Sequence, residues 1–459
     1  MSGSFEKLSV PPTLVSFAIS MADIDDIITP ELKSPNDRVY LIEPSEFGQD
    51  GGVAEVEMLR AVSELIKSKK IISAYVPGEG GVAAAVMNMC FGNMLGFAFE
   101  DGAEALFKNR GLCIVAEASD ELPFGQSLGK VTDDGFISKG DMRIALKELL
   151  DISEAKLETV FPLRAKTAQS SAVKPSFSIT DGNVRRAPSV RTARPKVVIP
   201  VFPGTNCEYD TANAFEATGA LTETVVITNL TPADVSDSAL RMRKAIDDAQ
   251  IVFIPGGFSG GDEPDGSGKF ITAFFRNPLI AEGVTELLEK RDGLMGGICN
   301  GFQALIKLGL VPFGKICEAN EHSPTLTYNT IGRHVSRLIT TRVASNMSPW
   351  YSDYSVGELH TMPVSHGEGR FICSQELFDK LAANGQIATQ YVSPDGEPSM
   401  DIRFNPNGSF NAVEGITSPD GRIFGKMGHS ERFGAGLYKN VPNDDDRKLF
   451  SCGVAYFTK

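Results

Sequence analysis

A cysteine between closely spaced glycines marks the carboxyl-terminal half of the sequence. Cys299 lies in Gly297-Ile298-Cys299-Asn300-Gly301, at the end of the apolar run GLMGGIC. This pattern is typical of a nucleophile elbow, in which small neighbours permit a tight turn from a strand into a helix. The turn would expose the sulfur at a helix N-terminus, where backbone N–H groups lower the pKa of a thiol. The pattern therefore favours a catalytic thiol over a buried structural cysteine.

A thiol nucleophile needs a base, and the segment GHSE supplies an imidazole, His429, and a carboxylate, Glu431, two residues apart. In an extended segment both side chains point the same way, so Glu431 can orient His429 while the other ring nitrogen faces Cys299. The chain has five His, and His366 in the segment SHGEG is the main rival base. The residues alone leave an ordinary surface histidine open as the interpretation of either one.

A glycine-rich loop, PGGFSGGD over residues 255–262, follows another apolar run. Glycine lets backbone N–H groups approach a ligand, and such groups would complete an oxyanion hole with the N–H of Asn300. Taken alone, the loop fits a phosphate-binding nest or a mobile surface loop equally well. Cys207, in GTNCE, begins a predicted helix but lacks the elbow glycines, so we interpret it as a packing or capping residue and not as a second nucleophile.

The downstream elements alternate between strand and helix. Predicted strands at 196–202, 221–228, 249–255 and 293–299 are separated by predicted helices at 207–218 and 233–248, with further helical stretches before the last strand. Strand-helix units of this length predict an α/β fold with a mostly parallel sheet covered on both faces. Active sites of such sheets lie at the carboxyl ends of the strands, where Cys299 is expected.

The upstream elements predict a separate α/β unit. Residues 13–27 and 37–43 are expected to be strands with nothing local to pack against, like the end of a domain whose beginning is missing. An amphipathic helix over about 52–69, a strand at 71–77, a glycine turn at 78–81 and an apolar helix follow. We therefore expect four parts: residues 1–50, the incomplete end of one subdomain; 51–165, a compact α/β unit; 166–194, a Ser-, Pro- and Arg-rich linker; and 195–459.

Composition limits the class of protein. The formal charge of −14 disfavours a nucleic-acid partner, although the arginines of the linker remain open as a docking stripe for an acidic surface. Seven Cys with no C-x-x-C pair argue against a disulfide framework and against a structural zinc site, so no metal is expected. Neither a signal peptide nor a bilayer-spanning apolar run is evident, which favours a cytoplasmic location and no membrane partner.

A set of motifs in one order resembles the glutaminase domain of the phosphoribosylformylglycinamidine synthase family: VFPGTNCE, PGGFSGGD, GICNGFQ, SHGEGRF, NPNGS and VEGITSPDGRIFGKMGHSER. The likeness runs over nearly all of residues 195–459. It implies a flavodoxin-like class I glutamine amidotransferase domain. Residues 1–165 resemble, less sharply, the end of the synthetase portion of that family, an aminoimidazole ribonucleotide synthetase-like domain, and this chain is similar to the carboxyl-terminal piece of a longer enzyme.

The resemblance implies roles for particular residues. Glutamine would be hydrolysed through a thioester on Cys299, with His429 as base and acid and Glu431 as its orienting partner. The remaining expected oxyanion and substrate-binding residues are Gly257, Phe258, Asn300, Gln303 and His366.

The resemblance also implies partners. Ammonia would pass to the synthetase portion, which in the complete enzyme of purine (IMP) biosynthesis uses ATP and Mg²⁺ to convert formylglycinamide ribonucleotide to its amidine. No cofactor is implied for the glutaminase domain itself. The segment GEGGVAAAV lacks the G-K-[ST] of a phosphate-binding loop, so Gly78 to Gly81 are interpreted as a structural turn, with the border of a nucleotide pocket left open. Two alternatives remain open: a noncatalytic fragment or interaction module, and a Cys hydrolase of another substrate on the same fold.

Overall fold

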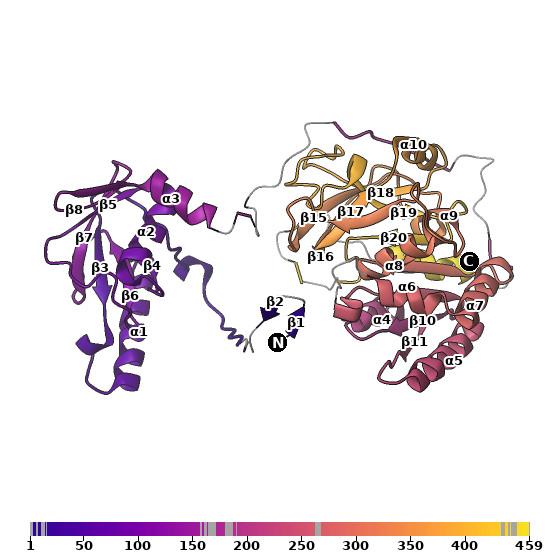
Figure 1. Ribbon diagram of the computed structural model, residues 1–459, viewed down its shortest axis with the longest axis horizontal. Helices are drawn as coiled ribbons and strands as arrows, with labels where there is room; N and C mark the ends of the chain where they lie inside the picture. The colour runs from indigo at the N-terminus through magenta and orange to yellow at the C-terminus, as the bar shows by residue number, and fades with distance from the viewer. Residues whose placement is uncertain are drawn as a thin grey trace. The chain divides into compact units, whose positions relative to one another are not determined.

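The computed structural model describes residues 3–5, 8–10, 14, 16–156, 158–159, 163, 171–179, 187–189, 191–261, 268–432, 437–438, 441 and 448–458. The chain divides into two compact units, Met1–Thr159 and Val160–Lys459 (Figure 1). Among the described residues, no helix combines the length and the hydrophobicity that crossing a bilayer requires.

The amino-terminal unit is built on a seven-stranded sheet in the order β4-β6-β3-β7-β5-β8-β9. Its described pairings are antiparallel apart from the parallel pair β5–β8. A separate pair of short strands, β1 and β2, precedes the sheet. The strands are β1 Gly3–Phe5, β2 Leu8–Val10, β3 Arg38–Ile42, β4 Ile71–Tyr75, β5 Gly96–Phe99, β6 Ile114–Ala118, β7 Gln126–Thr132, β8 Phe136–Lys139 and β9 Met142–Ala145. The helices are α1 Gly51–Lys67, α2 Gly81–Asn93 and α3 Leu146–Ala155.

The strand β3 lies inside this sheet, between β6 and β7. Its side chains alternate between two hydrophobic clusters: Val39 and Leu41 pack with residues of α2, and Tyr40 and Ile42 pack with residues of α1. Because both faces are covered, the strand is apolar without interruption from Val39 to Ile42, after the exposed Arg38. The structure thus places residues 38–50 in the same unit as residues 51–155, whereas the sequence suggested a division at residue 50.

Residues 14 and 16–27 do not form the strand expected over 13–27. They are irregular apart from a short 3₁₀ turn, η1 Ile24–Asp26, and Phe17, Ile19 and Met21 are 88%, 97% and 100% exposed. The period-two alternation of apolar residues is present, but a strand also needs a hydrogen-bonded neighbour.

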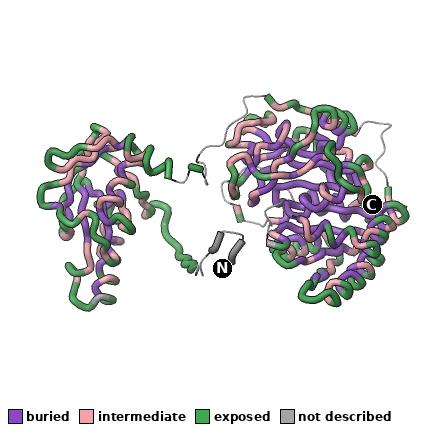
Figure 2. Tube along the Cα trace, viewed as in Figure 1, coloured by how far each residue is buried: buried purple, intermediate pink, exposed green. Residues whose placement is uncertain are grey.

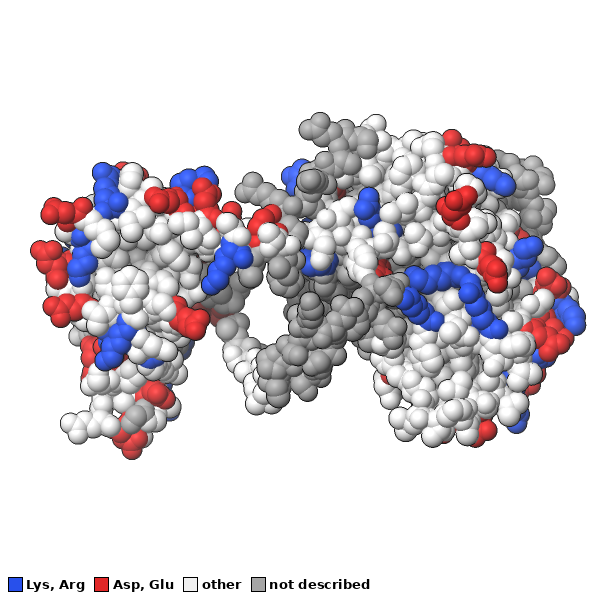
Figure 3. All heavy atoms as spheres, viewed as in Figure 1, with Lys and Arg blue, Asp and Glu red and all other residues white. Residues whose placement is uncertain are grey.

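Elsewhere on this unit, acidic and basic side chains are interspersed on the face shown in Figure 3.

The carboxyl-terminal unit contains a nine-stranded sheet in the order β11-β10-β12-β13-β20-β19-β18-β15-β16. The first five strands pair in parallel, and the pairings from β20 to β16 are antiparallel. The sheet is therefore mixed, and the prediction of a mostly parallel sheet is wrong beyond β20, because β15–β16, β18–β19 and β19–β20 follow one another in the chain without an α-helical crossover and pair antiparallel. The strands are β10 Lys196–Val201, β11 Leu221–Val226, β12 Ile251–Ile254, β13 Leu294–Ile298, β15 Val335–Val343, β16 Leu359–His366, β18 Ile387–Tyr391, β19 Val413–Thr417 and β20 Ile423–Lys426, with β14 Thr325–Tyr328 and β17 Glu368–Ile372 forming a separate pair.

Helices enclose this sheet, whose strands are mostly buried in Figure 2. Edge-to-face ring contacts join Phe215 of α4 to Phe253 of β12 and to Phe450 of α11, so these two helices cover one face of the sheet. The single tryptophan, Trp350, packs against Phe424 of β20 in the same aromatic cluster. The helices are α4 Glu208–Glu216, α5 Pro232–Asp248, α6 Lys269–Phe275, α7 Pro278–Glu289, α8 Asn300–Leu308, α9 Leu310–Phe313, α10 Gln375–Ala383 and α11 Lys448–Thr458.

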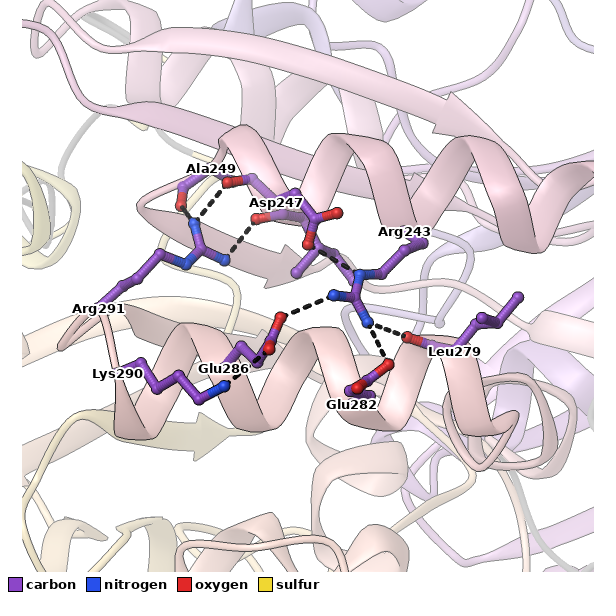
Figure 4. Close-up of polar contacts among 9 residues, drawn as sticks. Arg243, Asp247, Ala249, Leu279, Glu282, Glu286, Lys290 and Arg291 are labelled. Atoms are coloured by element: carbon purple, nitrogen blue, oxygen red, sulfur yellow. Dashed lines mark hydrogen bonds and ion pairs between the residues drawn. The ribbon is translucent and has the colours of Figure 1, made fainter.

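Helices α5 and α7 lie side by side and are joined by arginines (Figure 4). Arg243 of α5 donates to Asp247 on its own helix at 2.8 Å and to Glu282 and Glu286 of α7 at 2.9 and 2.7 Å. Arg291 donates to the carbonyl groups of Ile246 and Asp247 in the last turn of α5, and its charge complements the negative end of the helix dipole.

Part of the expected linker packs on the carboxyl-terminal unit. We call residues 171–179 the connecting segment. The N–H of Phe177 donates to the carbonyl of Ala344 at 2.9 Å, and its ring lies against Gly385. The buried Arg342 of β15 donates to the carbonyl of Pro175 at 2.9 Å and to Ser176 Oγ at 2.8 Å. The connecting segment is therefore not a solvated connector, while residues 164–170 and 180–186 lie outside the described part of the chain.

Candidate active site

The turn from β13 into α8 has the geometry that the glycine pattern predicts. Cys299 has φ 53° and ψ −107°, a conformation that costs a non-glycine residue free energy and is held by its surroundings. A Cβ atom at Gly301 would lie 2.0 Å from the carbonyl oxygen of Ile254, and one at Gly297 would lie 2.7 Å from the carbonyl carbon of Gly301. Both glycines are required because the backbones meet at contact distance.

The thiol of Cys299 is buried, with 4% of the residue exposed. Its backbone N–H donates to the carbonyl of Lys426 at 2.8 Å, and its Sγ lies 3.8 Å from the carbonyl oxygen of Ser365. Burial raises the pKa of this thiol, with smaller contributions from Cys207 and Glu431, and outweighs the hydrogen bond from the N–H of Asn300 that lowers it. The expectation of a pKa lowered by the helix end is therefore wrong for this conformation, and ionisation of the thiol needs a base.

His429 and Glu431 form a buried pair. The Nδ1–H of His429 donates to Oε1 of Glu431 at 2.6 Å, and the two side chains are 1% and 0% exposed. The backbone N–H of His429 donates to the carbonyl of Pro363 at 2.9 Å, which fixes the segment against β16. The other ring nitrogen, Nε2, is buried without a hydrogen-bond partner among the described residues, so it is available as a proton acceptor.

Gly256 is the point at which these side chains meet. A Cβ atom added to it would lie 2.8 Å from Cε1 of His429, 3.1 Å from Sγ of Cys207 and 3.5 Å from Cβ of Cys299. The imidazole and the two cysteines therefore surround one glycine. The elbow cysteine, the histidine and the carboxylate, which the sequence separates by 130 residues, lie together in the structure.

The glycine-rich loop is held by the segment that precedes α4. The N–H groups of Asn206 and Cys207 donate to the carbonyl of Gly256, both at 3.3 Å, and the N–H of Phe258 donates to the carbonyl of Gly204 at 2.8 Å. Gly257 has φ 151°, and a Cβ atom there would lie 2.6 Å from Cα of Thr205. The N–H of Phe258 is thus already engaged and is not an oxyanion donor in this conformation, while Asp262 lies outside the described residues.

Asn300 and Gln303 connect α8 to the glycine-rich loop and to the first residue of β17. Oδ1 of Asn300 accepts from the N–H of Ser259 at 3.2 Å, and its Nδ2 donates to Oε1 of Gln303 at 2.9 Å. Nε2 of Gln303 donates in turn to the carbonyl of Glu368. These two residues therefore tie the glycine-rich loop and the start of β17 to the helix that follows Cys299.

His366 ends β16 and is buried, but its environment differs from that of His429. Burial lowers its pKa to about 3, with smaller contributions from His429 and His334. Its Nε2 accepts from Nδ2 of Asn407 at 3.2 Å. A neutral imidazole whose acceptor nitrogen is already used is a poor general base, which leaves His429 as the base that the geometry favours.

Comparisons with known proteins show to which family the chain belongs. Residues 194–457 match the family model described as a CobB/CobQ-like glutamine amidotransferase domain. The phosphoribosylformylglycinamidine synthase subunit PurQ of Methanococcus maripaludis is 35% identical over 239 residues, which cover 52% of this chain and 82% of that protein. The PurQ subunit of Treponema denticola is 36% identical over 251 residues, with 52% of this chain and 88% of that protein covered. The chain belongs to the CobB/CobQ-like glutamine amidotransferase family.

The chain is also similar to a chain of a solved structure, PurLQS from Thermotoga maritima, with 25% sequence identity and a TM-score of 0.42. The match covers 57% of this chain and 99% of that one.

The amidotransferase site includes buried charged residues that the sequence analysis did not single out. Glu414 of β19 accepts from the N–H of Gly428 at 2.6 Å, and Nζ of Lys426 of β20 donates to Ser430 Oγ at 2.8 Å. Both residues are 1% exposed. They hold the segment of His429 from both sides. A signal was present, because a charged residue inside an apolar strand, as in VEGIT and IFGK, needs a buried partner.

Proposed function

We propose that the carboxyl-terminal unit is the glutaminase of a phosphoribosylformylglycinamidine synthase and supplies ammonia for the amidine-forming step of purine biosynthesis. The observation that carries the proposal is the meeting of the Cys299 elbow and the His429–Glu431 pair around Gly256. Membership of the amidotransferase family and the PurQ relatives support the same reaction.

In the proposed mechanism, Nε2 of His429 takes the proton from Cys299, and the thiolate attacks the side-chain amide carbon of glutamine. The N–H groups of Gly257 and Asn300 are proposed to hold the oxyanion. The tetrahedral intermediate collapses when His429 returns the proton to the departing nitrogen, which leaves ammonia and a glutamyl thioester. Water, deprotonated by His429, then hydrolyses the thioester to glutamate and restores the thiol.

Glu431 keeps His429 in the tautomer whose Nε2 accepts a proton and stabilises the imidazolium that forms. Gln303, Phe258 and His366 are proposed to border the bound glutamine. His366 would act there as a neutral group, because burial holds its pKa at about 3.

The amino-terminal unit is proposed to be the end of a synthetase portion, and the synthetase is proposed as the partner that receives the ammonia. The ATP- and magnesium-dependent step would lie on that portion, and no step above uses it. A cytoplasmic location fits this role.

The test uses a glutamine-directed electrophile and an ammonia bypass. The electrophile should label Cys299 in preference to the other six thiols, and glutamine should protect it. In the complete synthase, Cys299→Ala should abolish synthesis from glutamine and spare synthesis from added ammonium. Cys452→Ala, which removes a buried thiol of α11, is the matched control and should keep both activities.

Two other outcomes would replace the proposal. No glutamate release, with or without added synthetase portion, would leave a noncatalytic interaction module. Turnover of another amide or ester through Cys299, with glutamine inert, would make the chain a different cysteine hydrolase.

A further inference from the structure

The proposed base, His429, and its carboxylate partner, Glu431, lie beside a second thiol, that of Cys207. Sγ of Cys207 lies 3.9 Å from Nδ1 of His429, and the donor atoms of Cys207, His429 and Glu431 all lie within 4.8 Å of one another. All three residues are buried. The sequence could not indicate this cluster, because Cys207 and His429 are 222 residues apart.

This donor set is one that zinc prefers. Thiolate, imidazole and carboxylate are the three protein ligands of Zn²⁺, bound at about 2.3, 2.0 and 2.1 Å. Two donors of one ion therefore stand no more than about 4.6 Å apart, twice the longest of these bonds. The separation of 3.9 Å between Cys207 and His429 falls inside this limit, and the donor atoms of Cys207 and Glu431 lie within 4.8 Å, close to it. The hydrogen-bonded atoms of His429 and Glu431, at 2.6 Å, are closer than two donors of a tetrahedral ion, about 3.3 Å apart, so binding must separate them.

Glu431 has a donor atom to spare. Its Oε1 accepts from His429, whereas its Oε2 is buried without a hydrogen-bond partner among the described residues. A buried carboxylate oxygen in that state is costly unless an ion or a water satisfies it. A second bond from Glu431 or a water would complete four-coordination.

One neighbouring group opposes a cation. Nη2 of Arg432 donates to Sγ of Cys207 at 3.0 Å. Arg432 is only partly buried, so its guanidinium can turn outward when an ion takes the thiolate. The guanidinium would then compete with Zn²⁺ for the thiolate and lower the Zn²⁺ affinity without preventing binding.

We propose that Cys207, His429 and Glu431 form a binding site for Zn²⁺ that switches the glutaminase off. Binding releases the thiol proton of Cys207 and moves the ring proton of His429 from Nδ1 to Nε2, because a coordinated atom cannot keep its proton. When Nδ1 holds the metal, the remaining proton of the neutral ring must lie on Nε2. That nitrogen then cannot accept the proton of Cys299.

The inhibitory effect rests on the proposed function, but the site itself is tested without activity. The full chain carrying Cys299→Ser, which removes the catalytic thiol as a donor, is titrated with Zn²⁺ against a chromophoric chelator. Co²⁺ is the spectroscopic probe, because a cysteine ligand gives sulfur-to-cobalt charge-transfer absorption. We expect one site per chain with that absorption. Adding Cys207→Ser should weaken Zn²⁺ binding at least about tenfold and remove the band.

Two further variants sharpen the result. Cys90→Ser removes a buried thiol of the amino-terminal unit and should leave Zn²⁺ binding unchanged. Arg432→Met should tighten Zn²⁺ binding, because it removes the competing positive charge. Circular dichroism and the thermal melting point check that each variant is folded. If the Cys207→Ser protein does not fold, the Zn²⁺ affinity of Arg432→Met alone tests the proposal.

Any of three results overturns the proposal. The Cys299→Ser chain binds no Zn²⁺, the folded Cys207→Ser variant keeps its Zn²⁺ affinity and its cobalt band, or Arg432→Met leaves the Zn²⁺ affinity unchanged. In the chain with Cys299 intact, Zn²⁺ should inhibit glutamate release and a chelator should restore it. Zn²⁺ binding without inhibition would keep the site and refute its regulatory effect. A chain that binds Zn²⁺ but releases no glutamate under any condition would instead contradict the glutaminase assignment.

Discussion

Nδ1 of His429 lies 2.6 Å from Oε1 of Glu431 in an environment that excludes water from both side chains. A charge-assisted hydrogen bond of this kind is stronger when buried, and it fixes both the orientation and the tautomer of the ring. The same ring lies against Gly256, which also contacts Cys299. The carboxylate therefore acts on the nucleophile only through the imidazole.

The first prediction concerns the charge of that carboxylate. Glu431→Gln keeps the shape of the side chain, but its amide can donate to Nδ1 and stabilise the tautomer whose Nε2 carries the proton. We expect the kcat for glutamate release to fall roughly 10²- to 10⁴-fold with little change in KM. Steady-state release of glutamate measures this, and an unchanged kcat would remove Glu431 from the mechanism.

The second prediction concerns the glycine that allows the elbow. Gly301→Ala would place a methyl group 2.0 Å from the carbonyl oxygen of Ile254, between two backbones that cannot yield easily. We expect a loss of about 1–3 kcal/mol in the free energy of unfolding, together with loss of glutaminase activity. Urea unfolding followed by the fluorescence of Trp350, the single tryptophan, reports on this unit.

The matched control is Gly367→Ala, where the added methyl group would meet only the backbone nitrogen of His334 at 4.0 Å. Its unfolding free energy should stay within about 0.5 kcal/mol of the parent. A Gly301→Ala protein as stable as this control would show that the elbow tolerates a side chain.

Local pattern was enough to find the elbow and the His429–Glu431 pair, because both are defined by residues that are neighbours in sequence. The parallel half of the larger sheet also followed from alternating strands and helices. Contacts between segments far apart in the chain could not be predicted from local sequence patterns. Nothing near Cys207 in the sequence indicates that it lies beside His429, and nothing near Arg342 indicates that it binds the connecting segment.

The pKa of Cys299 shows why a correct local argument gave the wrong direction. A helix N-terminus stabilises a charge by about 0.3–1 kcal/mol, or about 2 in partly buried geometry. Removing a thiolate from water shifts a pKa by up to about 3–5 units when the group is fully buried. The sequence revealed the helix end but not the degree of burial, and burial is the larger effect.

The third prediction concerns acid stability. The pKa of His366 is lowered to about 3 by burial, whereas an unfolded histidine titrates near 6.5. Above about pH 6.5 the ring is neutral in both states and contributes nothing. As the pH falls from about 6.5 to 3, the unfolded chain takes up a proton that the folded chain cannot, so the folded state loses stability.

His366→Gln should remove this contribution. Between pH 7.5 and pH 5.5 the variant is expected to lose about 1.4 kcal/mol less unfolding free energy than the parent. Urea unfolding at the two pH values measures the difference. Equal losses in both proteins would mean that His366 takes up its proton in the folded state as readily as in the unfolded chain.

The last prediction concerns the connecting segment. Arg342 is 2% exposed and donates to the carbonyl of Pro175, to Ser176 Oγ and to Oε1 of Gln390. Arg342→Met fills a similar volume but leaves these acceptors without their donor, so we expect a loss of about 2–4 kcal/mol in unfolding free energy and faster proteolysis within residues 171–179. Arg403→Met is the control, because Arg403 pairs with Asp401 at an exposed position and should contribute under about 1 kcal/mol. Equal effects of the two substitutions, measured by Trp350 fluorescence and by the rate of cleavage, would mean that the segment is held by the packing of Phe177 on Gly385 and not by the buried arginine.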